Sequence, residues 1–263
     1  MRDFLRHPRP TGLAMVLVLS FGLVLSGCSD DDDDTPTGPT DTEFNEAFAA
    51  QQAQSVVPLV VDLVDNLSIY AVNPPNKAAD DYYEWVYNAM NGRWEGAAEM
   101  SYEDMTIAYL GWLQYLDSDG NAVQMAADAA SYSFHNELEM VGAYSDESIS
   151  WSLEMQTEED YTVDGLNTEV LQVVADASAN IDYSSTSGGN TSSATYAYSY
   201  RTLGEGITFP VAGCPTGEIE FTFAPYRVVV TFDGTATASY AMYDGNGNSI
   251  PAGSGTEPLD CAK

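Results

Sequence analysis

The sequence predicts a mainly β fold, an antiparallel meander of about 10 to 12 strands that forms a barrel or half-barrel with an N-terminal helical segment packed on it. Three observations predict this class. Apolar and polar residues alternate in several segments, such as 149–155, and turn-forming pairs such as Asn91-Gly92 separate these segments. No helical pattern alternates with them, which disfavours a parallel sheet. The segments at 105–116 and 168–183 are longer than an average strand, and long twisted hairpins tend to close or curl.

The N-terminal region has the pattern of an export signal. Basic residues precede an apolar run at 13–25, which has the length of the apolar part of a signal peptide. The run ends in Leu-Ser-Gly-Cys at 25–28, and this ending resembles the lipobox of bacterial lipoproteins. The resemblance implies that residues 1–27 are removed as a signal peptide and that Cys28 carries lipid, including acyl chains such as palmitate. Two or more chains anchor a protein stably, so we expect a membrane-anchored lipoprotein; a transmembrane helix is the alternative.

The segment that follows Cys28 has the composition of a tether. Ser29 and five aspartates at 30–34 precede a Thr/Pro/Gly stretch, so we expect an extended, solvated linker over 28–40. In proteobacterial lipoprotein sorting, a serine directly after the lipidated cysteine resembles an outer-membrane address. In some other bacterial groups an acidic run at this place resembles a surface-export signal, so the sequence leaves the periplasmic and the cell-surface side open.

The charge of the chain restricts its partners. The 40 acidic and 8 basic residues give a formal net charge of −32. Such a field repels phosphate backbones, so we expect no nucleic-acid partner, and the membrane contact is expected through the lipid anchor alone. Divalent cations and basic partners remain compatible with this charge, and so does a solubilising role in a saline habitat.

A helical segment is expected at 41–72, at the start of a single β-rich domain spanning 41–263. Phe44, Ala47 and Phe48 follow helical spacing, and Pro58 interrupts the pattern. A second stretch within the segment carries apolar residues on one helical face, namely Val56, Val60, Leu63, Val64 and Leu67. A helix followed by such a sheet resembles the lipoprotein-carrier architecture, in which an incomplete barrel wraps a helix around an apolar cavity.

From about residue 82 the apolar period changes from helical to two. Tyr83, Trp85 and Tyr87 alternate with other residues, as Tyr196, Tyr198 and Tyr200 do later in the chain. Sequences typical of hairpin turns separate these segments. The expected turns are 117–121, 164–165, 184–193, 233–234 and 244–247.

Two cysteines remain besides Cys28. A chain exported to an oxidising compartment is expected to pair them, so the sequence predicts a disulfide between Cys214 and Cys261. By the chain-entropy estimate, a bridge that closes a loop of this length stabilises the fold by roughly 4 kcal/mol. It would fix the C-terminal tail to the loop that precedes a strand.

One candidate metal site has oxygen ligands at alternate positions. Asp117, Asp119 and Asn121 resemble the opening of a calcium loop. The helices and the bidentate glutamate of a full calcium loop are missing from this pattern, so a hairpin turn is the favoured interpretation. No other metal and no cofactor is expected.

His135 is the one histidine beyond the signal peptide. The alternation from 132 to 140 places it opposite Tyr132 and Phe134, on the face that turns toward solvent. One outward-facing imidazole gives neither a His-rich metal site nor a good base for a serine triad, so no catalytic role is expected.

Two larger groups of side chains are candidates for a site. A glycosidase-type pair of carboxylates is formally available, but sequence does not give the separation that this chemistry requires. Aromatic stripes on strands usually pack in a core, and sometimes bind sugar or lipid. The carboxylates are Glu137, Glu139, Glu154, Glu158, Glu159 and Asp160, and the aromatic residues are Tyr196, Tyr198, Tyr200, Trp85, Trp112 and Trp151.

The sequence therefore favours a non-enzymatic binding or scaffolding module of the cell envelope. The expected ligand is apolar, held in a cavity between helix and sheet, or else the partner is another envelope protein. Two other functions stay open, a carboxylate-based hydrolase on a β scaffold and a purely structural surface subunit.

Overall fold

The computed structural model describes residues 84–102, 104–146, 148–259 and 261, together with six residues between 50 and 61. These six are Ala50, Ala53, Gln54, Val57, Pro58 and Val61, and all are helical. The chain then forms strands and a single short 3-10 helix within the described part. The elements are β1 (Glu84–Asn88), β2 (Arg93–Tyr102), β3 (Met105–Leu116), β4 (Ala122–Val123), η2 (Ala126–Asp128), β5 (Ser131–Ser145), β6 (Ile149–Asp164), β7 (Val170–Ser187), β8 (Asn190–Pro210), β9 (Thr216–Phe223), β10 (Tyr226–Asp233), β11 (Thr237–Tyr243) and β12 (Ser249–Pro258).

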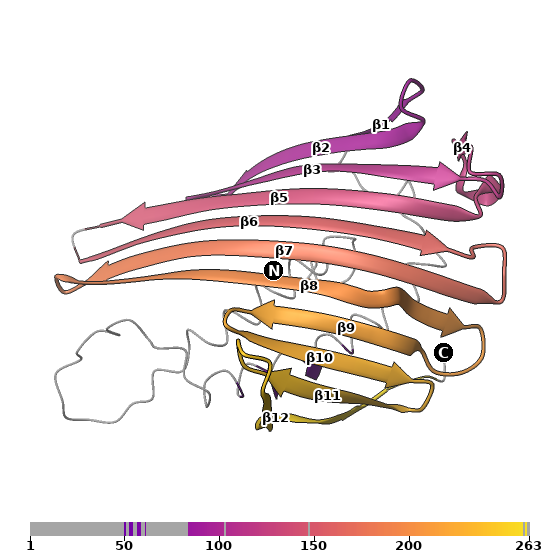
Figure 1. Ribbon diagram of the computed structural model, residues 1–263. Coiled ribbons are helices and arrows are strands. Elements are labelled where there is room, and N and C mark those ends of the chain that lie inside the picture. The colour runs from indigo at the N-terminus through magenta and orange to yellow at the C-terminus, as the bar shows by residue number, and fades with distance from the viewer. Residues whose placement is uncertain are drawn as a thin grey trace.

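The strands form one 12-stranded sheet in the order β1-β2-β3-β5-β6-β7-β8-β9-β10-β11-β12, with β4 paired to β3 (Figure 1). Neighbouring strands are antiparallel, and most of them are joined by hairpin connections, whereas β4 and η2 lie between β3 and β5. The antiparallel meander predicted from the sequence is confirmed. A closed barrel is wrong, because β1 and β12 end the sheet and do not pair with each other.

Strand and turn positions follow the sequence pattern closely in places. The segment predicted at 105–116 is β3, and the segment predicted at 168–183 is β7, which runs on to Ser187. The turn predicted at 184–193 is much shorter, because β7 and β8 stay paired to Ser187↔Asn190. Only Gly188 and Gly189 form its tip, with φ of +58° and +82° that suit a tight hairpin turn.

The sheet has two different faces. We call the face that carries the buried residues of the core the inner face, as at Tyr132 and Phe134, and the opposite one the outer face. Burial alternates along the long strands, because successive side chains point to opposite faces. Ala50, Ala53, Val57 and Val61 belong to the same buried cluster as the inner-face residues. The rest of the helical segment predicted at 41–72 lies outside the described residues.

The core occupies only one end of the sheet. We call the stretches 137–145, 149–157, 179–187 and 190–197 of β5 to β8 the far end, and the rest of the sheet the packed end. The far end extends beyond β9 to β12 at the left of Figure 1, since β8 pairs with β9 only from Tyr198 onward. Met155, Ala179 and Ile181 are buried at the far end, but they lie outside the main cluster.

A bend in β8 lets the packed end curve. The register with β9 shifts between Leu203 and Thr208, and the strand bends there in Figure 1. Gly206 has a φ of +97°, and a Cβ at this position would lie 2.3 Å from the carbonyl oxygen of Val173. Only glycine fits this bulge without a clash.

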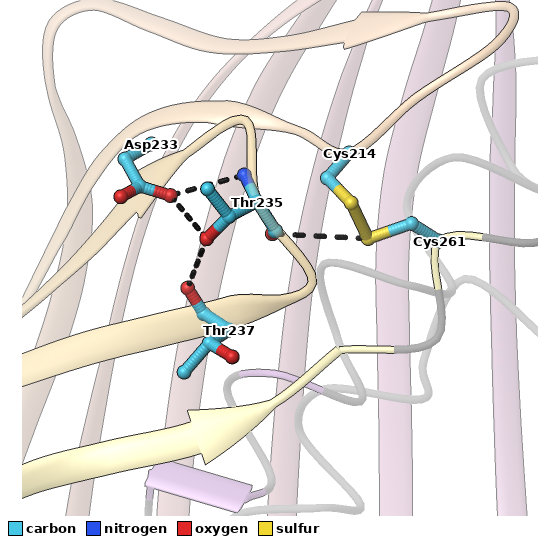
Figure 2. Close-up of a disulfide and its surroundings, with 5 residues drawn as sticks. All are labelled: Cys214, Asp233, Thr235, Thr237 and Cys261. Atoms are coloured by element: carbon cyan, nitrogen blue, oxygen red, sulfur yellow. Dashed lines mark hydrogen bonds between the residues drawn. A yellow bond between two sulfur atoms is a disulfide. The ribbon is translucent and has the colours of Figure 1, made fainter.

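The C-terminal segment is joined to the sheet covalently. Cys214 and Cys261 form a disulfide, with a Cα–Cα distance of 4.9 Å and a sequence separation of 47, in agreement with the predicted pairing (Figure 2). Cys261 Sγ lies 3.9 Å from the carbonyl oxygen of Thr235, in the turn after β10. Asp233 holds that turn by accepting hydrogen bonds from the backbone N–H and hydroxyl of Thr235. The bridge thus fixes Cys261, near the end of the chain, to the β8–β9 connection that carries Cys214, as the sequence predicted, and places it beside the β10–β11 turn.

The predicted signal peptide at 1–27, Cys28 and the tether at 28–40 lie outside the described residues, so they remain predictions. Among the residues that the structure describes, no helix combines the length and the apolar composition needed to span a membrane.

Candidate functional site

Two polar side chains face each other in the middle of the inner face. Asn136 of β5 pairs in register with Glu159 of β6, and the amide Nδ2 of Asn136 donates a 3.1 Å hydrogen bond to Glu159 Oε2. Thr157 points to the same face, two residues before Glu159 on β6. We call Asn136, Thr157 and Glu159 the inner-face polar cluster.

The inner-face polar cluster is buried and incompletely hydrogen-bonded. Asn136 is 0%, Glu159 2% and Thr157 5% exposed. Asn136 Oδ1, Thr157 Oγ1 and Glu159 Oε1 have no hydrogen-bond partner in the described part of the chain. Burial raises the pKa of Glu159 to about 7, and the hydrogen bond from Asn136 only partly opposes this rise. Unpartnered polar atoms at such depth are rare in folded proteins, so this cluster is the first candidate for a binding site.

Small residues beside the cluster accommodate large aromatic ones. Glu159 pairs in register with Ala177 of β7, and Ala177 pairs with Tyr200 of β8. On the other side Gly111 of β3 pairs with Asn136. The hydroxyl oxygen of Tyr109 lies 2.7 Å from the position that a Cβ of Gly111 would take, so a larger residue there would clash with it. Aromatic rings therefore border the polar cluster across the strands.

An apolar track runs from the cluster along the far end of β5 and β6. Leu138 pairs with Thr157, Met140 with Met155, and Leu153 follows on the same face. Leu138, Met140 and Leu153 are partly exposed, whereas Met155 is buried. The track from Glu159 to Leu153 is roughly 20 Å long at the usual rise of a strand. The inner face thus changes from closed core to polar cluster to accessible apolar surface.

The outer face carries a second cluster around His135. The alternation predicted its side of the sheet correctly, yet its side chain is only 14% exposed because Trp112 stacks on it at 5.7 Å. His135 Nδ1 lies 2.9 Å from Asp160 Oδ1, and Nε2 lies 3.1 Å from Glu137 Oε1. Burial lowers the pKa of His135, but the hydrogen bonds to Asp160 and Glu137 outweigh this effect and raise it above its usual value.

His135, Glu158 and Asp160 bring ligand atoms within 4.8 Å of one another. The carboxylate of Asp160 already pairs with the imidazole, and both acidic residues are exposed. The hydrogen bonds and the stacked Trp112 account for this arrangement as a surface cluster that favours the protonated form of His135.

The register sets Glu159 apart from the other carboxylates that the sequence made eligible for hydrolysis. Glu137, Glu139, Glu154, Glu158 and Asp160 belong to the outer face, and Glu159 alone points inward. Among the described inner-face residues next to Glu159, none carries a second carboxylate. The geometry therefore gives no facing pair of the glycosidase type on this face.

The candidate calcium ligands form a turn. Asp117 Oδ1 accepts hydrogen bonds from the backbone N–H groups of Asp119, at 2.9 Å, and Asn121, at 2.8 Å. The side-chain amide of Asn121 also donates to the carboxylate of Asp117. These hydrogen bonds lower the pKa of Asp117, the one from Asn121 most, and they fit the favoured turn interpretation.

A second buried glutamate lies on the outer face. Glu220 is 8% exposed, and its two oxygens accept 2.7 Å hydrogen bonds from Arg201 Nη2 and Arg227 Nη1. Both oxygens thus have a cationic partner, unlike those of Glu159.

The predicted aromatic stripe on β8 lies on the inner face. Tyr200 is buried, and Tyr196 and Tyr198 are half-buried with their rings stacked at 6.2 Å. Tyr198 also contacts Phe221 at 6.0 Å, which joins the stripe to the core. Trp85 of β1 packs over Gly96 of β2, near the β1 edge of the sheet.

Sequence reasoning did not single out Asn136 and counted Glu159 only among several acidic residues. One signal was available for each. Asn136 is in phase with Tyr132 and Phe134, and Glu159 is in phase with Tyr161, so both are polar residues at inward positions.

No family model, curated protein or solved structure matches this chain. The case for a function therefore depends on the geometry of the two faces.

Proposed function

We propose that this chain is a lipid-anchored lipoprotein of the bacterial outer membrane whose inner sheet face binds an apolar or amphipathic ligand, without enzymatic activity. In this proposal the open sheet acts as a half-barrel over the helical residues at 50–61. The observation that carries it is the inner face itself, where buried, unpartnered polar atoms adjoin a partly exposed apolar track. Binding sites for small ligands commonly combine an apolar lining with a few polar groups.

The packing of the two ends supports this proposal. At the packed end the inner face is filled by its own side chains, including Phe134, Val163 and Ile219. At the far end Leu138, Met140 and Leu153 remain partly exposed, although they point to the same face. Exposed apolar surface of this kind often marks a place where another molecule binds.

The ligand proposal is tested by native mass spectrometry of the protein purified from its own membrane. We expect bound mass that is released on denaturation. Met140→Arg places a charge on the apolar track and should abolish this mass. Val141→Arg is the matched control, because Val141 is 46% exposed and lies on the opposite face of the same strand. A wild-type protein with no bound mass, or equal loading of both variants, would contradict the proposal.

The anchor is tested separately by fractionation. The wild-type chain, expressed with residues 1–27, should partition with outer membranes, and Cys28→Ala should not. Membrane binding by the alanine variant would overturn the anchor. Protease accessibility on intact cells then distinguishes the periplasmic from the surface side.

A further inference from the structure

We propose that the inner-face polar cluster binds the ammonium head group of a single-chain amine, whose alkyl chain lies along β5 and β6 toward the far end. This inference rests on the function proposed above, because it assigns a ligand class to the same face. It starts from Asn136, Thr157 and Glu159, which are all more than nine-tenths buried.

The unpartnered atoms of the cluster call for hydrogen-bond donors. The oxygens without a partner among the described residues are Asn136 Oδ1, Thr157 Oγ1 and Glu159 Oε1. An amide oxygen and an ionised carboxylate only accept hydrogen bonds, and a hydroxyl can accept them. A primary ammonium group has three N–H donors and no acceptor, so it complements these three oxygens.

The charges of the described residues favour a cationic head group. Arg93, Arg201 and Arg227 belong to the outer face, where they pair with Glu95 and Glu220. An anionic head group would therefore meet Glu159 with no described cation on the inner face. The net charge of −32 also attracts cations and repels anions at a distance.

The apolar track gives the direction of the chain. Leu138 and Thr157 are paired next to Asn136 and Glu159, and Met140 and Met155 form the following pair. In the opposite direction the core closes the face at Phe134. A head group at Glu159 therefore directs its alkyl chain along the track, away from the core at Phe134.

The test compares three probes with the same alkyl chain on the intact wild-type protein. Dodecylamine carries a charge and N–H donors, dodecyltrimethylammonium carries the charge without donors, and dodecanol is neutral. Titration calorimetry below the micellar concentrations gives the affinities. We expect dodecylamine to bind at least about tenfold more tightly than dodecyltrimethylammonium, because the latter leaves buried oxygens unpartnered.

Variants connect the preference to the cluster. Glu159→Gln should lower the affinity for dodecylamine at least about tenfold and leave the affinity for dodecanol nearly unchanged. Glu154→Gln is the matched control, because it removes the same charge from the exposed outer face of β6 and should change neither affinity.

The outcomes separate the two proposals. Equal affinities for dodecylamine and dodecyltrimethylammonium, or an unaffected Glu159→Gln, overturn the head-group assignment while binding itself persists. Failure of all three probes to bind overturns the proposed function. If Glu159→Gln does not fold, the comparison of the two cations on the wild-type protein still decides.

Discussion

The sheet buries one glutamate on each face, and their surroundings are opposite. Glu220, on the outer face, accepts hydrogen bonds from Arg201 and Arg227. Glu159, on the inner face, has one amide partner, Asn136, and one oxygen with none in the described part of the chain. A buried carboxylate without a countercharge opposes folding unless it stays protonated. Glu220 is therefore a structural ion-pair residue, and under the proposed function the unpartnered oxygen of Glu159 is the one available to a ligand.

The largest expected effect comes from removing the charge of Glu159. Its pKa is raised from 4.5 to about 7 by burial, so the folded state holds a proton that the unfolded state has lost. Stability is therefore complete below pH 4.5 and falls as the pH rises to about 7, by about 3 kcal/mol in total. Glu159→Gln should abolish this fall, and urea unfolding at several pH values measures it.

The matched variant for this prediction is Glu154→Gln, on the exposed outer face of the same strand. It controls for the general reduction of negative charge and should keep the pH dependence of the wild type. If both variants showed the same dependence, Glu159 would not be its source.

A smaller effect of opposite sign is expected at Glu220. Glu220→Gln removes both ion pairs, and because Arg201 and Arg227 are partly exposed, water stabilises them afterwards. We expect the free energy of unfolding to fall by about 1 to 2 kcal/mol at neutral pH. Added salt should make this difference smaller, because it screens the ion pairs of the wild type. Glu218→Gln, on the exposed part of β9, should stay within about 0.5 kcal/mol of the wild type. Chemical denaturation compares the two, and a stabilised Glu220→Gln would refute the contrast.

Two threonines sharpen the contrast between partnered and unpartnered groups. Thr157 Oγ1 is buried without a partner among described residues, whereas Thr202 Oγ1 accepts a 3.1 Å hydrogen bond from the N–H of Ala175. Thr157→Val should stabilise the protein by about 1 kcal/mol, and Thr202→Val should destabilise it by a similar amount. Thermal unfolding of both variants measures the difference; equal effects would mean that Thr157 has a partner after all.

The smallest expected effect concerns His135 on the outer face. The contacts with Asp160 and Glu137 raise its pKa, so the stability it contributes is complete below pH 6.5 and is lost as the pH rises through the folded value. Because Asp160 and Glu137 are exposed, we expect these contacts to contribute less than about 1 kcal/mol to the free energy of unfolding. An NMR titration should give a pKa above 6.5 for the wild type and a lower one in Asp160→Asn. An unchanged value in the variant would exclude this pairing.

Much of the fold follows from local patterns. Alternation in β5 predicted which of its side chains face the core, and the turn residues at 117–121 and 244–247 mark two hairpin connections. Whether the sheet closes into a barrel could not be predicted, because this depends on whether the first and last strands pair with each other and not on any one hairpin. The restriction of the core to one end could not be predicted either, since the apolar alternation of β5 and β6 continues past Asn136 and Glu159 through Leu138, Met140, Met155 and Leu153.

The candidate site was harder to predict than the fold. Asn136 and Glu159 lie 23 residues apart in the chain and become neighbours only through the register of β5 and β6. In the sequence Glu159 stands between Glu158 and Asp160 and looks like part of a solvated acidic run. Its inward position depends on its phase with Tyr161, one residue in a pattern that the acidic neighbours obscure.

The most direct test of this account is the titration of Glu159 itself. Carbon-13 NMR of glutamate side-chain carboxyls, with the signal assigned by its loss in Glu159→Gln, reports the pKa of this group. We expect ionisation near pH 7 in the free protein, the value that burial without a countercharge produces. A value near 4.5 would show that Glu159 is solvated or paired, and would contradict the contrast with Glu220.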